Sequence, residues 1–246
     1  MKSEPQNIYD HPEFFAGYQA LRQNDTGLNG VLEVPALRAA LPELTGTSVL
    51  DLGCGFGDFA RYARSSGAIC VMAIDVSTRM LDAAARLTTD PAIRYLHCSI
   101  EAYEPDAESF EIAVSSLVLH YVLDYPAIVR KVFAALKPGG RFIFTVEHPV
   151  CTANPIGWIR DEHGAKSCWP LDRYQAEGAR ETSWLIEGVT KYHRTVSTYV
   201  NTLIAAGFRL ERLEEPVPVA EGLALRPSLQ TELRRPPFLL LAARRP

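Results

Sequence analysis

The chain has 246 residues, of which 47% are hydrophobic and 22% are charged, and its formal net charge is −4. These values are typical of a soluble globular protein with one large domain, or with one domain and an elaboration. The mild acidity argues against nucleic acid as the main partner, because phosphate binding usually leaves a basic footprint.

The first residues lack the apolar core of a signal peptide, and no stretch reaches the roughly 20 apolar residues that cross a bilayer. The five cysteines show no CxxC pair and no metal-ligand spacing. Cys70 and Cys98 lie in apolar runs, and we expect both thiols to be buried. A cytoplasmic protein without a bound metal is therefore expected.

Helical segments are predicted near the start of the chain, over 12–18 and 34–41. From there to residue 147, strands and helices alternate with short turns. The predicted strands are 48–52, 69–74, 93–98, 111–116 and 141–146. Ser77 and Asp124 are of the residue types that begin helices, and we expect a helix after each. The alternation predicts an α/β fold with a parallel sheet covered on both faces and a ligand site beyond the carboxyl ends of its strands.

The regular alternation stops over 149–190, which contains all three tryptophans and several prolines. A long aromatic segment at the ligand edge of the sheet predicts a cap over a pocket, although a packed insertion that only stabilises the domain has the same composition. Regularity returns with a predicted helix over 195–206 and predicted strands over 208–213 and 238–243. The polar stretch 214–237 between these strands is expected to form a hairpin crossover.

The most informative motif is the glycine loop after the first strand, VLDLGCGFG over 49–57. Glycine at every second position lets the loop turn sharply and lets a ligand approach the backbone. Asp51, just before the loop, can orient it or meet a cationic amino group. Asp75 ends the second strand, where a carboxylate can accept hydrogen bonds from a ribose diol. Both aspartates can instead be simple helix caps, but the pair at this spacing favours a nucleotide-type cofactor.

Three segments together resemble class I S-adenosylmethionine-dependent methyltransferases: 49–57, 74–77 (IDVS) and 136–142 (LKPGGRF). The similarity covers about residues 46–147, and the motifs occur in the order typical of that family. It implies a Rossmann-like, doubly wound sheet of seven mainly parallel strands with an antiparallel last strand. It also implies S-adenosylmethionine as the cofactor and S-adenosylhomocysteine as its product.

The resemblance carries cofactor roles onto individual positions, with the glycine loop around the methionine part and Asp75 on the ribose. The implied cofactor-binding residues are Asp51, Gly53, Cys54, Gly55, Phe56, Gly57, Asp75, Val76, Met80, Ser99, Ile100 and Leu117. Many members of the family have an acidic residue where this chain has Ser99, and a serine hydroxyl accepts a hydrogen bond from adenine more weakly. Leu117 would lie near the ribose and the sulfonium.

In similar enzymes the N-terminal segment closes over the cofactor and the substrate. Tyr18 and Arg22 are four residues apart on one helical face, so they can act together at the cofactor, with Arg22 near its carboxylate. Tyr9 and Phe14 can face the acceptor, and Phe14 can equally be an apolar contact to the core.

Further segments resemble a bacterial subgroup of small-molecule methyltransferases of the type 11 and type 12 kind, which extends the similarity to nearly the whole chain. These segments are 115–121, 146–150, 169–172 and 189–195. The expected organisation is an N-terminal helical lid over 1–45, a cofactor-binding core over 46–147, a cap insertion over 148–194 and the C-terminal part of the core sheet over 195–246.

A catalytic base is needed only if the acceptor atom begins protonated. His120, His148 and His193 are the candidates, because histidine titrates near neutrality and the first two follow strands. Each of the three can equally be a structural residue. An aromatic wall would suit a planar or cationic acceptor. The candidate acceptor contacts are Tyr9, Phe14, His148, Trp158, Trp169 and Tyr174.

The sequence therefore predicts methyl transfer from S-adenosylmethionine to an oxygen, nitrogen or carbon of a small molecule, by a monomer or a homodimer without a membrane partner. One alternative is a methyltransferase that acts on a tRNA nucleoside, which would need a basic face. Another is a protein that binds S-adenosylmethionine without catalysis.

Overall fold

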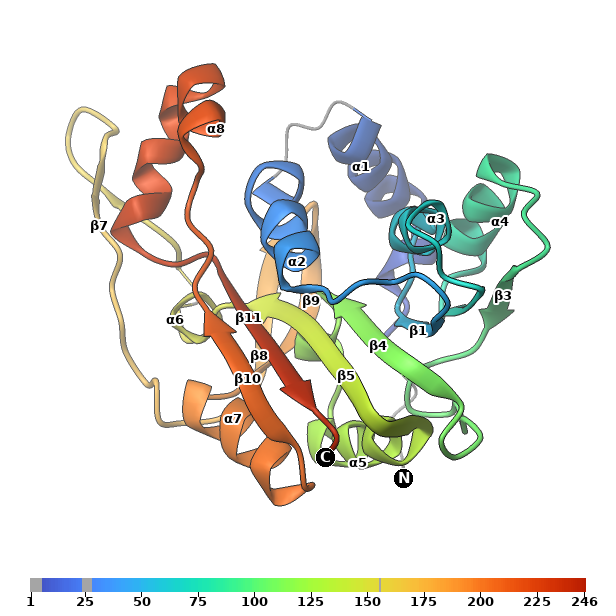
Figure 1. Cartoon of the computed structure of the whole chain (residues 1–246). Helices are drawn as coiled ribbons and strands as arrows, with labels where there is room; N and C mark the ends of the chain where they lie inside the picture. Colours follow the sequence, from blue (N-terminus) through green and yellow to red (C-terminus); the bar gives the residue numbers. More distant parts are fainter. Residues whose placement is uncertain (1–5, 24–27, 155) are drawn as a thin grey trace.

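The computed structural model describes residues 6–23, 28–154 and 156–246 and is organised around one seven-stranded sheet (Figure 1). Residues 1–5 and 24–27 of the expected N-terminal lid and residue 155 of the expected cap lie outside the described part. The strands of this sheet are β1 (Ser48–Leu52), β2 (Cys70–Asp75), β3 (Ile93–His97), β4 (Phe110–Ser116), β5 (Leu136–Glu147), β10 (Arg209–Glu214) and β11 (Phe238–Arg244).

The strand order is β10-β11-β5-β4-β1-β2-β3. The pairs from β3 through β5 are parallel, and β11 runs antiparallel to both of its neighbours. This confirms the predicted doubly wound sheet with an antiparallel last strand. The order reverses between β1 and β4, so the loops after these two strands meet at the carboxyl edge, where such sheets bind ligands.

Helices cover both faces of the sheet (Figure 1). The helical elements outside the insertion are η1 (Ile8–Asp10), α1 (Pro12–Gln23), the π-helical turn η2 (Asn29–Glu33), α2 (Val34–Ala40), α3 (Asp58–Ser65), α4 (Thr78–Leu87), η3 (Leu119–Tyr121), α5 (Tyr125–Ala135), α7 (Val196–Ala205), α8 (Ala220–Leu225) and η4 (Pro227–Arg234). On one face, α5 and α7 bury apolar side chains against β4, β5 and β11, and on the other face α2 and α3 pack against β1 and β2.

Local sequence explains where the helices of the core begin. Ser77 accepts a hydrogen bond from the backbone N–H of Met80, and Asp124 accepts one from Ala127, so each satisfies a free donor at a helix start. These are the two predicted caps. The helix after Asp124 ends at Ala135, and β5 begins at Leu136, five residues before the predicted strand 141–146, so that the Lys-Pro-Gly-Gly segment belongs to the strand and Gly139 donates to the carbonyl of Arg245.

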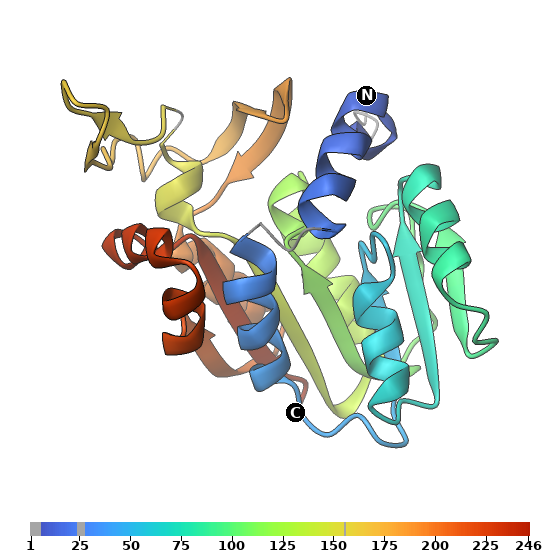
Figure 2. The same ribbon diagram turned by 90° about the horizontal axis from the view of Figure 1, so that it is seen from above.

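The insertion, residues 148–194, is built from one short helix and two hairpins. Its elements are α6 (Pro149–Thr152), β6 (Ile159–Arg160), β7 (Lys166–Cys168), β8 (Gly178–Trp184) and β9 (Ile186–His193). The β8–β9 hairpin stands beside α1 (Figure 2), and Phe14 meets Trp184 there with ring centroids 5.2 Å apart. The insertion therefore touches the N-terminal segment across the carboxyl edge of the sheet.

Two expectations about local structure are wrong. The crossover over 214–237 is not a hairpin but contains the helical elements α8 and η4. Cys70 is exposed and Cys98 is half-buried, because Cys70 is the first residue of its strand and Cys98 follows β3, the outermost strand of the sheet. Among the described residues, no helix is both long and apolar enough to cross a membrane.

Candidate functional site

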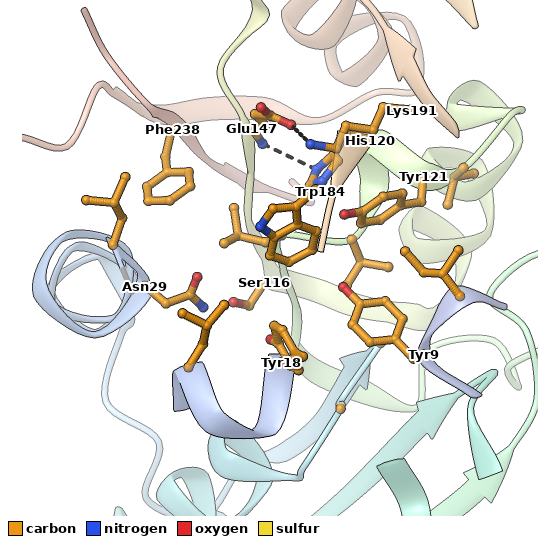
Figure 3. A pocket seen from close by; sticks show the side chains of 18 of the residues that line it. Tyr9, Tyr18, Asn29, Ser116, His120, Tyr121, Glu147, Trp184, Lys191 and Phe238 are labelled. Carbon is orange, nitrogen blue, oxygen red and sulfur yellow. Dashed lines mark hydrogen bonds and ion pairs between the residues drawn. The ribbon is translucent and has the colours of Figure 1, made fainter. Parts of the chain in front are cut away.

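A cavity of about 500 Å³ lies at the carboxyl edge of the sheet, where the loops after β1, β2 and β4 meet (Figure 3). The N-terminal segment, the insertion after β5 and the segment that leads into β11 form its other walls. A second, more polar hollow shares Tyr18, Arg22 and Ser116 with it and extends over Asp51 and the glycine loop. The two are parts of one site.

The glycine loop has the backbone geometry that its sequence predicts. Gly53, Gly55 and Gly57 all have positive φ, at 78°, 52° and 72°, a region that only glycine adopts freely. A Cβ on Gly53 would clash with Val118, and one on Gly57 would clash with Tyr95. A Cβ on Gly55 would meet nothing within 4 Å. The first and last glycines therefore allow close packing, while Gly55 leaves the backbone open to the cavity.

Two aspartates flank this loop from neighbouring strands. The Asp75 carboxylate accepts hydrogen bonds of 2.8 Å from the backbone N–H groups of Gly55 and Ser77 and lines the cavity. Asp51 is buried, and its Oδ2 has no hydrogen-bond partner in the described part of the chain. Burial, with a smaller contribution from the charge of Asp75, raises the pKa of Asp51 to about 8. The buried carboxyl therefore holds its proton near pH 7, and a cationic ligand group beside it would favour its charged form.

The wall on the β2 and β3 side combines apolar side chains with the polar Ser99 and the acidic Glu101. Val76, Met80 and Ile100 line the cavity together with Ser99. The Ser99 hydroxyl accepts a hydrogen bond from the backbone N–H of Ala102 at 3.2 Å. One of its acceptor sites is therefore used within the protein, which keeps Ser99 the weakest of the expected cofactor contacts.

The N-terminal segment covers the site and is fastened to α4. Asp10 accepts hydrogen bonds from the Ser77 hydroxyl and from the backbone N–H of Arg79. Tyr18 and Arg22 both line the cavity, and the Arg22 guanidinium pairs with Asp58 at 2.5 Å. The predicted lid residues thus lie over the glycine loop.

Beyond the loops after β4 and β5 the cavity becomes strongly aromatic. The aromatic chamber, as we name this part, is lined by Tyr9, Tyr121, Trp169, Trp184 and Phe238, with the side chains of His120, Glu147 and Lys191 at its polar end. Its walls come from four separate parts of the chain. Trp169 donates its indole N–H to the carbonyl of Val150 at 2.9 Å, which holds this wall in place.

An ion pair forms the polar end of the chamber (Figure 3). Lys191 Nζ lies 2.5 Å from Glu147 Oε2, and no described residue donates a hydrogen bond to Glu147 Oε1. His120 Nδ1 accepts the backbone N–H of Glu147 at 3.3 Å. Burial, followed by the charges of Lys191 and Arg194, holds the pKa of His120 well below its usual range. The ring is therefore neutral near pH 7 and carries its proton on Nε2, which makes it a donor in the chamber.

The other two candidate histidines do not line the cavity, which differs from the expectation. His148 caps α6 through Nδ1, which accepts from Val150, and its Nε2 lies 2.9 Å from Glu215 Oε1. His193 Nδ1 accepts from the Thr152 hydroxyl at 2.7 Å and its Nε2 donates to the carbonyl of Tyr174 at 2.8 Å. Both nitrogens of each ring are used within the protein, so both rings hold the insertion together.

Among the six predicted acceptor contacts, Tyr9 and Trp169 line the cavity, and three others, like His148, do not. Phe14 is fully buried against Trp184. Trp158 lies behind Trp169 with ring centroids 5.3 Å apart, and Tyr174 packs on His193. These three support the chamber from outside, as the alternative of a packed core predicts.

Sequence reasoning missed the residues of the ion pair and Trp184. Glu147 directly precedes His148, and the alternation of an extended chain is the signal that separates them, because neighbouring residues point to opposite faces. Lys191 and Trp184 belong to a hairpin that the sequence did not predict, and Lys191 Nζ lies 5.7 Å from the centroid of the Trp184 ring. Within the described residues, no group of three or more histidines, cysteines, aspartates or glutamates is placed to bind a metal.

The residues present fit the cofactor that the resemblance implies. The open backbone at Gly55, the carboxylate of Asp75 and the unpartnered Oδ2 of Asp51 lie side by side along one cavity. Gly53, Gly55, Asp75, Val76, Met80, Ser99, Ile100 and Leu117 all contribute to its wall, and Cys54, Phe56 and Asp51 border the adjoining hollow. These residues would hold the methionine, ribose and adenine parts.

A family model, a solved structure and a sequence relative match this chain. A model of the methyltransferase domain family matches residues 49–140. The crystal structure of an S-adenosylmethionine-dependent methyltransferase from Mesorhizobium loti is 47% identical, has a TM-score of 0.83, and covers 89% of this chain and 100% of that chain. An uncharacterized protein of Haemophilus influenzae is 33% identical over 97% of both chains.

A relative with a named acceptor matches a shorter part of the chain. The malonyl-acyl-carrier-protein O-methyltransferase of Salmonella typhimurium is 39% identical over 110 residues, which are 44% of this chain and 43% of that protein. The shared part is less than half of either protein.

Proposed function

Because the chain belongs to the S-adenosylmethionine-dependent methyltransferase family, we propose that it methylates an oxygen or nitrogen atom of a small, planar acceptor held in the aromatic chamber. S-adenosylmethionine is the methyl donor of this family. When bound, it supplies a methyl group that is already activated by the sulfonium charge. The protein then has to align the acceptor atom and exclude water.

The observation that carries this proposal is the continuity of one cavity from the glycine loop to the aromatic chamber. Gly53, Asp75 and Leu117 line one end of it, and Trp184 and Glu147 line the other. Aromatic side chains on several sides suit a flat ring, because they offer large apolar area at low conformational cost. The net charge of −4 favours a small acceptor over a tRNA nucleoside, because phosphate binding usually leaves a basic footprint.

The polar end of the chamber suits an acceptor that begins with an O–H or N–H group. Glu147 Oε1 can accept that hydrogen bond, while Lys191 Nζ occupies Oε2. The neutral His120 ring offers its Nε2–H to a second acceptor group of the same molecule. When the methyl group passes from the sulfonium sulfur to the acceptor oxygen or nitrogen, that atom would give its proton to Glu147 and then to solvent, and S-adenosylhomocysteine would remain.

A screen of planar acceptors tests the proposal. Purified protein with S-adenosylmethionine would be incubated with hydroxylated and aminated aromatic compounds, and the formation of S-adenosylhomocysteine would be measured. With an accepted compound, we expect Glu147→Gln to lower kcat about a hundredfold, the range of a positioned general base. Glu187→Gln is the matched control and should leave kcat unchanged, because Glu187 is an exposed carboxylate on β9, the strand that carries Lys191.

Three results would reject the proposal or part of it. Turnover of a tRNA with a steep salt dependence, and of no small acceptor, would favour the nucleic-acid alternative. Tight cofactor binding with no turnover of any acceptor would favour a binding protein. Full activity of Glu147→Gln would show that Glu147 does not take up the proton, and the proposal of a small acceptor would still stand.

A further inference from the structure

A buried glutamate from the N-terminal segment lies beside the cofactor end of the cavity. Glu33 is the last residue of the π-helical turn Asn29–Glu33 and is 0% exposed. Such turns carry an extra residue and often occur at functional sites. Here the turn places Asn29 and Gly30 in the cavity wall and directs Glu33 beneath it.

Glu33 is bound to the ends of the two central strands. Its Oε1 accepts the hydroxyl hydrogen of Ser116 at 2.8 Å and that of Thr145 at 2.6 Å. Ser116 lines both parts of the site, next to Gly53 and Gly55. The carboxyl group is therefore one hydrogen bond away from the wall that faces the cofactor.

The same network holds the strained residue after β4. Leu117 has a φ of +55°, which a leucine rarely adopts, and its N–H donates to both the carbonyl and the hydroxyl of Thr145. The Thr145 hydroxyl thus accepts from Leu117 and donates to Glu33. The lid and the turn that carries Leu117 share one set of hydrogen bonds.

The charge of Glu33 is not balanced within the described part of the protein. Its Oε2 has no hydrogen-bond partner there, and Oε1 receives only neutral hydroxyl groups. Arg22 is the cation whose charge acts on it, but the hydrogen-bonded partner of that guanidinium is Asp58. Burial raises the pKa of Glu33, as expected for a carboxylate that lacks a counter-charge.

We propose that Glu33 is the counter-charge for the cationic groups of S-adenosylmethionine, acting across the Ser116 hydroxyl. A carboxylate held in a dry site within several ångströms of a positive charge interacts with it strongly, because the local dielectric constant is low. S-adenosylmethionine carries a sulfonium and an ammonium, whereas S-adenosylhomocysteine carries only the ammonium. Glu33 therefore favours the methyl donor over the spent product. The inference concerns the cofactor and does not depend on which acceptor is methylated.

A series of three ligands tests this role by calorimetry without any turnover. S-adenosylmethionine has two positive charges, S-adenosylhomocysteine has one, and 5′-methylthioadenosine has none. Glu33→Gln keeps the acceptor oxygen for Ser116 and Thr145 and removes the charge. We expect it to weaken binding of S-adenosylmethionine about tenfold or more, S-adenosylhomocysteine less, and methylthioadenosine not measurably.

A matched control and a second variant make the outcome decisive. Glu111 also accepts hydrogen bonds from a serine, Ser48, but at the opposite end of β4, so Glu111→Gln should change the affinity of none of the three ligands. Glu33→Ala removes both the charge and the hydrogen bonds, and should add an equal loss for all three ligands to the graded loss. Equal losses for the three ligands in Glu33→Gln, or no loss at all, would overturn the proposal and leave Glu33 as a structural tie.

Discussion

Asp10 accepts a 2.6 Å hydrogen bond from the Ser77 hydroxyl, which joins the N-terminal segment to the residue that caps α4. Ser77 lies two residues after Asp75, which ends β2 and lines the cavity. One side chain of the lid is thus attached to the part of the core that would hold the ribose.

We expect Asp10→Ala to loosen the lid and to speed release of S-adenosylhomocysteine. A capping interaction is worth about 1 kcal/mol, so the affinity should fall about fivefold. Stopped-flow dissociation and hydrogen exchange over residues 6–23 measure the two effects. Asp124→Ala removes a comparable cap from α5, away from the cavity, and should lower stability without changing the dissociation rate. An unchanged rate in Asp10→Ala would show that the lid is held by other contacts.

The pKa of Asp51, about 8 in the free protein, predicts a pH-dependent affinity. Below that pH the carboxyl is protonated, and a ligand cation beside it favours the charged form. Binding of S-adenosylhomocysteine should therefore strengthen as the pH rises from 6 to 8, with release of a proton. Calorimetry in buffers of different ionisation enthalpy measures that proton, and Asp51→Asn should abolish the slope.

The same group predicts how the stability of the free protein changes with pH. An unfolded aspartate loses its proton near pH 4, whereas folded Asp51 keeps it to about pH 8. The unfolded state is therefore increasingly favoured by this group as the pH rises through that window. The melting temperature should fall less steeply between pH 5 and 8 in Asp51→Asn than in the unmodified protein. Parallel curves would show that Asp51 is charged in the folded state.

Alanine substitutions at Gly53 and Gly55 should separate folding from cofactor binding. A Cβ on Gly53 would clash with Val118, so Gly53→Ala should destabilise the free protein by about 2–3 kcal/mol. Gly55→Ala meets no neighbour and adds only the strain of a positive φ, about 1 kcal/mol. It should nevertheless bind S-adenosylhomocysteine at least tenfold more weakly, because its methyl group enters the cavity. Denaturation and calorimetry test the pair, and tight binding by Gly55→Ala would move the cofactor away from this glycine.

His148 should be important for stability and not for the cofactor. Its ring caps α6 and contacts Glu215, and only 3% of it is exposed. We expect His148→Ala to lower the free energy of unfolding by about 1–2 kcal/mol. The affinity for S-adenosylhomocysteine should stay within twofold, and so should turnover once an acceptor is known. A large loss of turnover with unchanged stability would show that His148 takes part in the reaction.

The core and its cofactor loop could be predicted from local signals. The spacing of Gly53, Gly55 and Gly57 encodes a positive φ at each position, and Ser77 and Asp124 are capping residues whatever surrounds them. These features depend on a few neighbouring residues, so a single sequence contains them. The antiparallel last strand followed from the family resemblance.

The chamber could not be predicted, because it depends on contacts between distant segments. Glu147 and Lys191 are 44 residues apart and meet only because the β8–β9 hairpin folds back over β5. His148 looked equivalent to His120, since both follow strands, and their neighbours alone decide that one faces the cavity. The position of Glu33 depends on the π-helical turn Asn29–Glu33, and no capping residue or glycine pattern in the sequence predicts that turn.

The hydrogen bonds of Gln6 set a limit on how ligands exchange. Its Oε1 accepts the N–H of Thr190 at 2.8 Å, and its Nε2 donates to the carbonyl of the same residue at 3.4 Å. These two hydrogen bonds join the lid to β9. A lid that is attached to the chamber wall swings together with it. We therefore expect the cofactor end and the acceptor end of the cavity to open together.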